Sequence, residues 1–520
     1  MASRCMLQSM IAARRRQTVV NMHWKHSVIL VSFLTIHALC DHFVLDCDAP
    51  GLRSSLASNT RDSSSMHTCS SNATGRALTE SNTYNSGDAR GLSRLRGGGF
   101  LPAFLVGPKP NVAGGSKEGM SKKNPRDSKR HSKQDTAQRI PFFLRWLFPT
   151  PPPKKKKMIT DPQHAVMLQS FDWEALSDRP KLYQDLVDEL PKMAEAGISV
   201  AWFPPPSASA DAQGYLPGKW YEIPHKESLL KAVEASKSVG VVPMVDVVLN
   251  HRTATKLSTT TNDWTTFENP DWEEWAIVKD DWKCEPEETK KFCLDNCTCG
   301  AADTGENACY APDIDHTNAT IQTDVVKWLR WLKGDLGFEA FRFDNTKGYS
   351  AKYTAQYIAA TQPLMSVSEY FDTNKDLMTA WIRGSNGSSR MFDFGMRYKL
   401  KDSVRQDDYS HLMEKFFGPM LWYDTEHSVT FLDNHDTAGE LNDRFGSPVD
   451  IERGYAVLLT HPGVPCIFWQ DWLGPNQEVI KRLLEIRGEG GVSSSSSWKV
   501  ETAGKGLYAA YVGERLAMNV

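Results

Sequence analysis

The chain has 520 residues and a formal net charge of −3, but this near-neutral value averages two unlike segments. Residues 1–160 contain 25 Lys and Arg against 9 Asp and Glu, whereas residues 161–520 contain 35 Lys and Arg against 54 Asp and Glu. A uniform single domain is therefore excluded. A nucleic-acid partner for the acidic segment is excluded too, because its charge would repel phosphates. With 40% apolar residues in the chain, the acidic segment can bury a large core.

The basic segment begins with the most apolar run of the chain, VILVSFLTIHAL at residues 28–39. The run follows Lys25, and it is shorter than the ~20 residues that a membrane span needs. We therefore predict a signal peptide over residues 1–40, with an uncleaved signal anchor as the alternative. Secretion or endomembrane routing follows, with no stable membrane span in the mature chain.

Residues 41–160 are rich in Ser, Asn, Gly, Lys and Arg, and they lack apolar periodicity apart from the pieces FLPAFLV and IPFFLRWLF. Such a segment cannot offset its ordering entropy by burial, so we expect a disordered, basic, low-complexity leader or linker. A second address for a plastid-type organelle and a membrane-docking role for the basic runs remain as alternatives.

From residue 161 to residue 490, short apolar runs alternate with amphipathic stretches, and a long insertion at 251–318 follows the third run. Alternation of apolar strands and helices is typical of a parallel sheet covered by helices. Eight such units predict a catalytic (β/α)8 TIM barrel of the α/β class, with an open doubly wound sheet as the alternative. The expected strands are 164–171, 199–206, 241–250, 338–345, 364–371, 390–398, 428–435 and 464–472.

Residues 491–520 follow the last predicted helix and contain material for only two or three strands. A sheet of this size has an unpaired edge and is marginally stable by itself. We expect either a reduced C-terminal antiparallel β domain or a chain that is truncated at this end.

Charged and polar residues gather at the ends of four predicted strands, namely Asp246, Asn250 and His251, then Arg342 and Asp344, then Glu369, then Asp433, His435 and Asp436. Such strand ends share one rim of a barrel, and buried carboxylates are costly unless they are paired or functional. This pattern predicts a catalytic cluster rather than separate helix caps and salt bridges. Paired carboxyl groups, without a Ser or Cys beside a base, favour retaining glycoside hydrolysis. Arg342 would then keep its neighbouring carboxylate ionised by lowering its pKa.

The segments DVVLNH, FRFDNTKGYS, SEYFD and FLDNHD, in this order, resemble the four signature regions of alpha-amylases in glycoside hydrolase family 13. WFPPPSAS, GYLPG, APDIDH and LTHPGVPCIF resemble the plant-type branch, and the likeness covers roughly residues 164–515. The resemblance implies endo-acting, retaining hydrolysis of α-1,4 bonds in starch- or glycogen-type glucans by a monomer. An α-glucan transferase, an α-1,6-acting relative and a non-catalytic glucan-binding relative are the alternatives.

The resemblance also assigns roles to residues. It implies Asp344 as nucleophile, Glu369 as general acid and base, and Asp436 as the carboxylate that stabilises the transition state. It implies substrate binding by Arg342, His251, His435, Tyr215 and Lys347, with support from Asp246. The insertion corresponds to the family's B domain, whose structural Ca²⁺ would be held by Asn250, Asp303 and Asp313 and by the backbone of Glu306 and Gly348. An all-oxygen set suits calcium, and turn capping by these Asp residues is the alternative.

Five cysteines gather in the insertion, at Cys284, Cys293, Cys297, Cys299 and Cys309. Behind a signal peptide we expect disulfides with one thiol left over. Zinc binding is the alternative, although the spacing contains no CxxC pair. Cys466, inside the last apolar run, is predicted to be a buried small hydrophobe.

Overall fold

The computed structural model describes residues 104–106, 157–259, 262–281, 298–413, 418–439 and 441–520. All of them lie in one compact unit that includes Pro102–Val520. The predicted signal peptide and most of the basic leader fall outside the described residues. Within the described ranges, we find no helix with the length and apolar character that a bilayer crossing requires.

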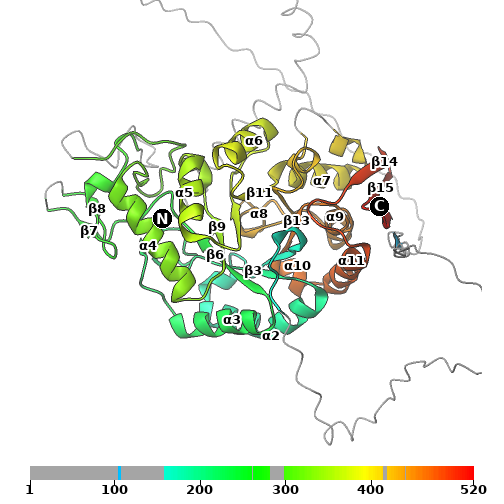
Figure 1. Cartoon of the computed structure of the whole chain (residues 1–520), viewed down its shortest axis with the longest axis horizontal. Helices are drawn as coiled ribbons and strands as arrows, with labels where there is room; N and C mark the ends of the chain where they lie inside the picture. Colours follow the sequence, from blue (N-terminus) through cyan, green and yellow to red (C-terminus); the bar gives the residue numbers. More distant parts are fainter. Residues whose placement is uncertain (1–103, 107–156, 260–261, 282–297, 414–417, 440) are drawn as a thin grey trace, which may run out of the picture. The chain divides into compact units, whose positions relative to one another are not determined.

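Eight parallel strands close into a barrel in which each strand pairs with the next one along the chain, and the last pairs with the first. This arrangement confirms the predicted (β/α)8 barrel (Figure 1). The strands are β2 (Met167–Gln169), β3 (Val200–Phe203), β6 (Val242–Val247), β9 (Ala340–Phe343), β10 (Met365–Ser368), β11 (Arg390–Phe392), β12 (Ser428–Phe431) and β13 (Val464–Phe468).

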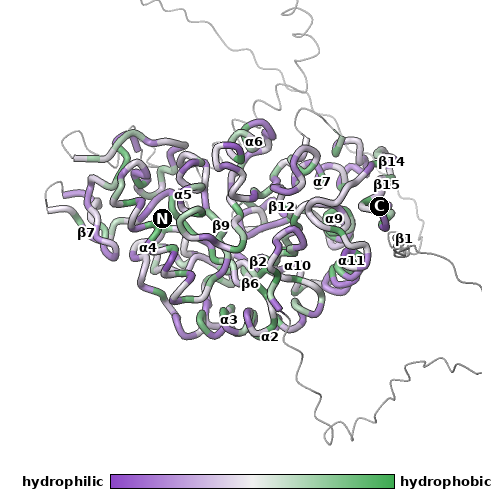
Figure 2. Tube along the Cα trace, in the orientation of Figure 1, coloured by the Kyte–Doolittle hydropathy of each residue, from purple (hydrophilic) through white to green (hydrophobic). Residues whose placement is uncertain are grey.

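Helices surround the barrel (Figure 1), and hydrophobic residues recur among hydrophilic ones along them (Figure 2). In α2, for example, Asp178 caps the first turn, Leu182, Leu186 and Leu190 are buried at a spacing of four residues, and Gly197 ends the helix at a φ of 100°. The main helices are α2 (Arg179–Ala196), α3 (Lys226–Ser238), α4 (Ala319–Gly334), α5 (Ala351–Thr361), α6 (Lys375–Gly384), α7 (Phe394–Gln406), α9 (Pro448–Thr460) and α11 (Gln477–Gly490).

Each predicted barrel strand extends beyond the end of the observed one, and two of them run several residues into a helix. β11 ends at Phe392, because the Asp393 carboxylate accepts a hydrogen bond from the Met396 amide and starts α7 there. β13 ends at Phe468, and the short helix α10 (Trp469–Leu473) follows directly. Both errors arise because an apolar run that enters a buried helix cannot be told from a strand by its hydrophobicity.

The C-terminal sheet contains β14 (Trp498–Gly504), β15 (Leu507–Val512) and β16 (Leu516–Asn519), all antiparallel. A fourth strand, β1 (Phe104–Val106), pairs antiparallel with β16 and comes from the FLPAFLV piece of the leader. One edge of the small sheet, at β16, is thus paired. The leader, which we expected to be disordered, contributes this three-residue strand from one of its two apolar pieces.

Short hairpins and loops build the excursions between strands. The hairpin of β4 (Ala208–Ser209) and β5 (Pro217–Lys219) follows β3, and that of β7 (Lys256–Leu257) and β8 (Trp264–Thr266) lies in the insertion. The buried Arg252 guanidinium stabilises the insertion and joins it to β5: it lies over the ring of Trp272 at 4.7 Å, donates to the Pro270 carbonyl at 2.8 Å, and donates through Nε to the Gly218 carbonyl of β5 at 3.0 Å.

The described cysteines distinguish between disulfides and zinc binding at two positions of the insertion. Cys299 and Cys309 are both disulfide-bonded, which confirms disulfides and excludes zinc ligation at these two positions. The other three cysteines of the insertion, Cys284, Cys293 and Cys297, lie outside the described residues. Cys466 is a free, buried thiol in β13, as predicted.

Candidate active site

The centre of the site is the guanidinium of Arg342, which is fully buried in β9. Its Nη1 donates to Asp246 Oδ1 at 2.8 Å and to Asp344 Oδ1 at 2.7 Å. Its Nη2 lies 3.0 Å from Glu369 Oε2. The carboxyl groups belong to, or directly follow, the neighbouring strands β6, β9 and β10, so three adjacent strands deliver three carboxylates to one cation.

Asp246 organises the aromatic side of the site. Its Oδ2 accepts hydrogen bonds from Trp202 Nε1 at 3.1 Å and from the Tyr215 hydroxyl at 2.9 Å. The Tyr215 ring, which the β4–β5 hairpin carries, is thereby fixed in orientation. Trp202 is a contact that the sequence did not point to, because it lies inside β3 rather than at its end.

Charge in this cluster is unbalanced, since three carboxylates share one guanidinium. Burial raises the pKa of Asp246 to about 6 against the opposing effect of Arg342. Burial also raises the pKa of Asp344 well above its ordinary value; Arg342 opposes this rise, and Glu369 and Asp246 add to it. Arg342 thus lowers the pKa of Asp344 as expected, but burial outweighs this effect, and the net shift of the pKa is upward. The cluster takes up a proton more readily than isolated carboxylates do.

Two neutral histidines flank the cluster. Burial lowers the pKa of His251 to about 4 and that of His435 well below its usual range. His435 Nδ1 lies 2.8 Å from the Gln169 amide nitrogen, which can only donate, so the ring proton is on Nε2, 3.6 Å from Asp436 Oδ2. His251 Nε2 lies 2.7 Å from the Tyr215 carbonyl oxygen, so this nitrogen also carries the proton.

A stack of flat rings lines the site beside His435. The His435 ring lies parallel to Tyr215 at 4.9 Å and to Trp173 at 5.9 Å between centroids. Flat apolar faces of this kind bind the faces of sugar rings. Trp173 and Gln169, at the end of the first barrel strand, were not predicted as site residues from the sequence.

Asp436 stands on α8 (His435–Ala438), a single turn after β12. Its exposed fraction is 6%, like that of Asp344, while that of Glu369 is 8%. All three predicted catalytic carboxyl groups are therefore nearly buried, each with a small exposed part at the rim of the barrel.

The loop after β9 connects the site to the insertion. The Asn345 amide donates to Glu369 Oε2 at 3.1 Å, and the Asn345 side chain donates to the Tyr310 hydroxyl at 3.3 Å. Lys347 Nζ lies 3.0 Å from Asp372 Oδ2 and 3.3 Å from Glu306 Oε1. Tyr310 of the insertion thus contacts the residue whose amide binds Glu369, and no sequence motif pointed to Tyr310.

The predicted calcium ligands lie around Asn250, the residue that precedes His251. Asn250 Nδ2 donates to Asp313 Oδ1 at 2.6 Å, and the Glu306 amide donates to the Lys347 carbonyl at 2.9 Å. A Cβ added to Gly348 would lie 1.8 Å from Asn250 Oδ1, so only glycine permits this close approach.

Two oxygens of this group, Asn250 Oδ1 and Asp303 Oδ2, are buried without a hydrogen-bond partner. Burial also raises the pKa of Asp303 and that of Asp313. Orphaned buried oxygens beside uncompensated carboxylates fit a hard cation. Among the described residues, no three or more His, Cys, Asp and Glu side chains form a metal site alone, so the fit depends on the amide and carbonyl oxygens.

Comparisons with known proteins agree with the carboxylate site described above. The chain is 34% identical over 387 residues to "Probable alpha-amylase 2" of Arabidopsis thaliana. The aligned region covers 68% of this chain and 87% of that protein. The chain belongs to the alpha-amylase family. It is also 28% identical to "Alpha-amylase 3, chloroplastic" of the same plant, over 68% of this chain but only 41% of that relative. These plant relatives confirm the plant-type resemblance; no protein-family model matches the chain.

Solved structures show the same fold. The alpha-amylase of Malbranchea cinnamomea superimposes with a TM-score of 0.54 at 14% identity, over 69% of this chain and 84% of that one. The alpha-amylase of Geobacillus thermoleovorans superimposes with a TM-score of 0.52 at 13% identity, over 69% and 85% of the two chains. At such identities the likeness concerns the fold alone.

Proposed function

We propose that this member of the alpha-amylase family is an endo-acting, retaining hydrolase of α-1,4-glucosidic bonds in starch- or glycogen-type glucans. The observation that carries the proposal is the single guanidinium that holds Asp344 on one amino group and Glu369 on the other. Groups bound to one guanidinium stand close together. This suits the short separation of about 5–5.5 Å in retaining enzymes better than the wider gap of inverting ones.

The reaction assigns one task to each carboxyl group. Asp344 attacks the anomeric carbon, and Glu369 gives its proton to the departing glycosidic oxygen, so that a glycosyl ester forms on Asp344. Glu369 then removes a proton from the water that hydrolyses this ester. A cluster with three carboxyl groups and one cation readily stores the proton that the first step consumes.

Neutral and aromatic side chains would bind the sugar. The Nε2–H of His435 can donate to a sugar hydroxyl beside Asp436, and the parallel rings of Tyr215 and Trp173 offer an apolar platform. Lys347 can contact the sugar on the leaving-group side. Because the substrate is uncharged, the acidity of the segment does not oppose binding.

We further propose that calcium binds to Asn250, Asp303 and Asp313 and to the backbone of Glu306 and Gly348. The orphaned oxygens of Asn250 and Asp303 support this ligand set. The cation would offset the buried carboxylates and hold the insertion beside His251. Secretion or endomembrane routing, with a plastid as the alternative, and a monomeric state complete the proposal.

The test of the activity is incubation of the full chain with soluble starch and calcium, followed by sizing of the products. An endo-acting enzyme lowers the mean chain length rapidly and releases a mixture of short oligosaccharides. Stepwise release of a single small sugar, transfer products without hydrolysis, or no reaction would contradict the proposal.

A further inference from the structure

The connection from β12 to α9 carries His435 and Asp436 on α8, a single helical turn. An isolated turn fixes several backbone dihedrals for very few hydrogen bonds and is unstable by itself. The position of the Asp436 carboxylate must therefore be maintained by contacts outside the turn.

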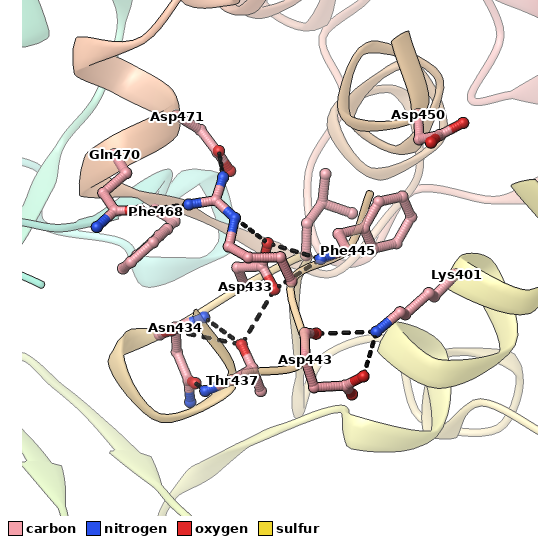
Figure 3. A network of polar contacts seen from close by, with 12 residues as sticks. Lys401, Asp433, Asn434, Thr437, Asp443, Phe445, Asp450, Phe468, Gln470 and Asp471 are labelled. Atoms are coloured by element: carbon pink, nitrogen blue, oxygen red, sulfur yellow. Dashed lines mark hydrogen bonds and ion pairs between the residues drawn. The ribbon is translucent and has the colours of Figure 1, made fainter. Parts of the chain in front are cut away.

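The buried carboxylate of Asp433, which lies just after β12, supplies such contacts (Figure 3). Its Oδ1 accepts hydrogen bonds from the Thr437 hydroxyl and from Arg397 Nη2, both at 3.1 Å. Its Oδ2 accepts from the Phe445 amide at 3.0 Å and lies 3.3 Å from Arg444 Nε. This one carboxylate thus joins the start of the connection to its end.

Thr437 transmits this anchoring to the turn. Its hydroxyl donates to Asp433 and accepts from the Asn434 amide at 3.0 Å, while its own amide donates to Asn434 Oδ1 at 2.9 Å (Figure 3). Thr437 directly follows Asp436 in the chain. A shift of Thr437 therefore moves the Asp436 carboxylate and the neighbouring His435 ring.

Helix α7 secures the network from outside the barrel. Arg397 donates through Nε to the Leu432 carbonyl at 2.9 Å and through Nη1 to Asp443 Oδ2 at 3.1 Å. Lys401 Nζ donates to Asp443 Oδ1 at 2.6 Å, and the Asp443 amide donates to the Thr437 carbonyl at 2.7 Å. Cations and carboxylates alternate here, so the network holds its charges without the surplus of acid seen around Arg342.

We propose that Asp433, acting through the Thr437 hydroxyl, is a positioning residue that holds Asp436 and His435 in the geometry that hydrolysis requires. The inference rests on the proposed function. It differs from a purely structural role in one respect: loss of the contact should slow the chemical step in protein that remains folded.

The experiment is a double-mutant cycle in the full chain with Asp433→Asn and Thr437→Val, plus the conservative Thr437→Ser. Thr437→Val should lower kcat on maltoheptaose about 10-fold or more while KM changes less than about 3-fold, because misplacement of a reacting group acts mainly on the chemical step. Thr437→Ser keeps the hydroxyl and should restore kcat to within about 3-fold of the wild type. The double variant should lose no more than the worse single variant, because both changes act on the same hydrogen bond, between the Thr437 hydroxyl and Asp433.

The matched control is Asp393→Asn. Asp393 is also a buried carboxylate after a barrel strand, and it accepts from the Leu421 amide at 2.7 Å and the Met420 amide at 3.1 Å rather than from α8. It should lower the melting temperature without a comparable loss of kcat. If Thr437→Val keeps wild-type kcat, or if Thr437→Ser is as impaired as Thr437→Val, the inference is overturned; should Asp433→Asn fail to fold, the Thr437 pair still decides. A wild-type chain that hydrolyses no α-glucan would instead refute the proposed function and the inference with it.

Discussion

Two clusters of arginine and carboxylate side chains stand at the same end of the barrel and differ in charge balance. Around Arg342, one guanidinium serves Asp246, Asp344 and Glu369. Around Asp433, by contrast, Arg397 and Arg444 flank a single carboxylate. The first arrangement raises carboxyl pKa values and can exchange a proton; the second gives each charge an opposite partner and is suited to holding a loop in place. At this end of the barrel, we assign the Arg342 cluster to the chemical step and the Asp433 cluster to the positioning of catalytic side chains.

The largest difference between the clusters should appear when one acid is neutralised in each. Glu369→Gln removes the proton donor and should lower kcat on starch about 10⁴-fold, at the upper end of general acid catalysis, whereas Asp433→Asn should cost only about 10- to 100-fold. Kinetics on both variants, with circular dichroism to verify folding, measure this. Equal losses would remove the distinction between the clusters.

Calcium removal tests the proposed calcium ligands, of which Asn250 directly precedes His251 of the active site. Chelation should lower the melting temperature by about 5–10 °C, if calcium was present at ~100-fold its Kd. Asn250→Ala should melt near the chelated wild type and respond little to added calcium. An unchanged melting temperature in the chelated wild type would refute the ligand set.

The pH profile should report the surplus of acid around Arg342. Asp344 must be ionised to attack, and its pKa is raised in part by Asp246, so activity should already fall at a pH above that at which an ordinary aspartate is protonated. Asp246→Asn removes that like charge and should move the acid limb of kcat/KM to lower pH. Stability has the opposite sign: the pKa of Asp246 is about 6 when folded and 3.8 when unfolded, so its contribution is lost as the pH rises through that window. An acid limb that stays in place or moves to higher pH would contradict this account.

The smallest effect on activity is expected when Tyr215 loses its hydroxyl group but keeps its aromatic ring. Tyr215→Phe deletes the hydrogen bond to Asp246 and keeps the stack on His435, so kcat/KM should fall by about 3- to 10-fold, in line with one hydrogen bond. Tyr215→Ala, which also removes the platform, should lose considerably more. If the two substitutions were equivalent, the ring would have no role in binding.

Much of this architecture could be predicted from the sequence, because each barrel strand is a continuous apolar run and four of these runs end in charged residues. Asp246, Arg342, Asp344 and Glu369 were found in this way, and the structure brings them together. The strand β1 could not be predicted, because its partner β16 lies at the other end of the chain and three residues carry little pattern.

The direction of the Asp344 pKa was also beyond the sequence. It depends on how many carboxylates share Arg342 and on how deeply they are buried, and neither is a local property of the chain. The role of Asp433 was hidden for a similar reason: its position at a strand end was evident, but its contacts come from α7 and from the residues after α8. Spacing along the chain predicts which residues reach the rim, and packing decides what each of them does there.

The most direct test of the central claim is the anomeric form of the first product. The full chain, supplied with calcium, is mixed with maltoheptaose, and the new reducing ends are followed by proton NMR before mutarotation equilibrates them. Attack by Asp344 followed by attack of water predicts that the α-anomer appears first. Initial release of the β-anomer would mean direct displacement by water and would contradict the assignment of Asp344 and Glu369.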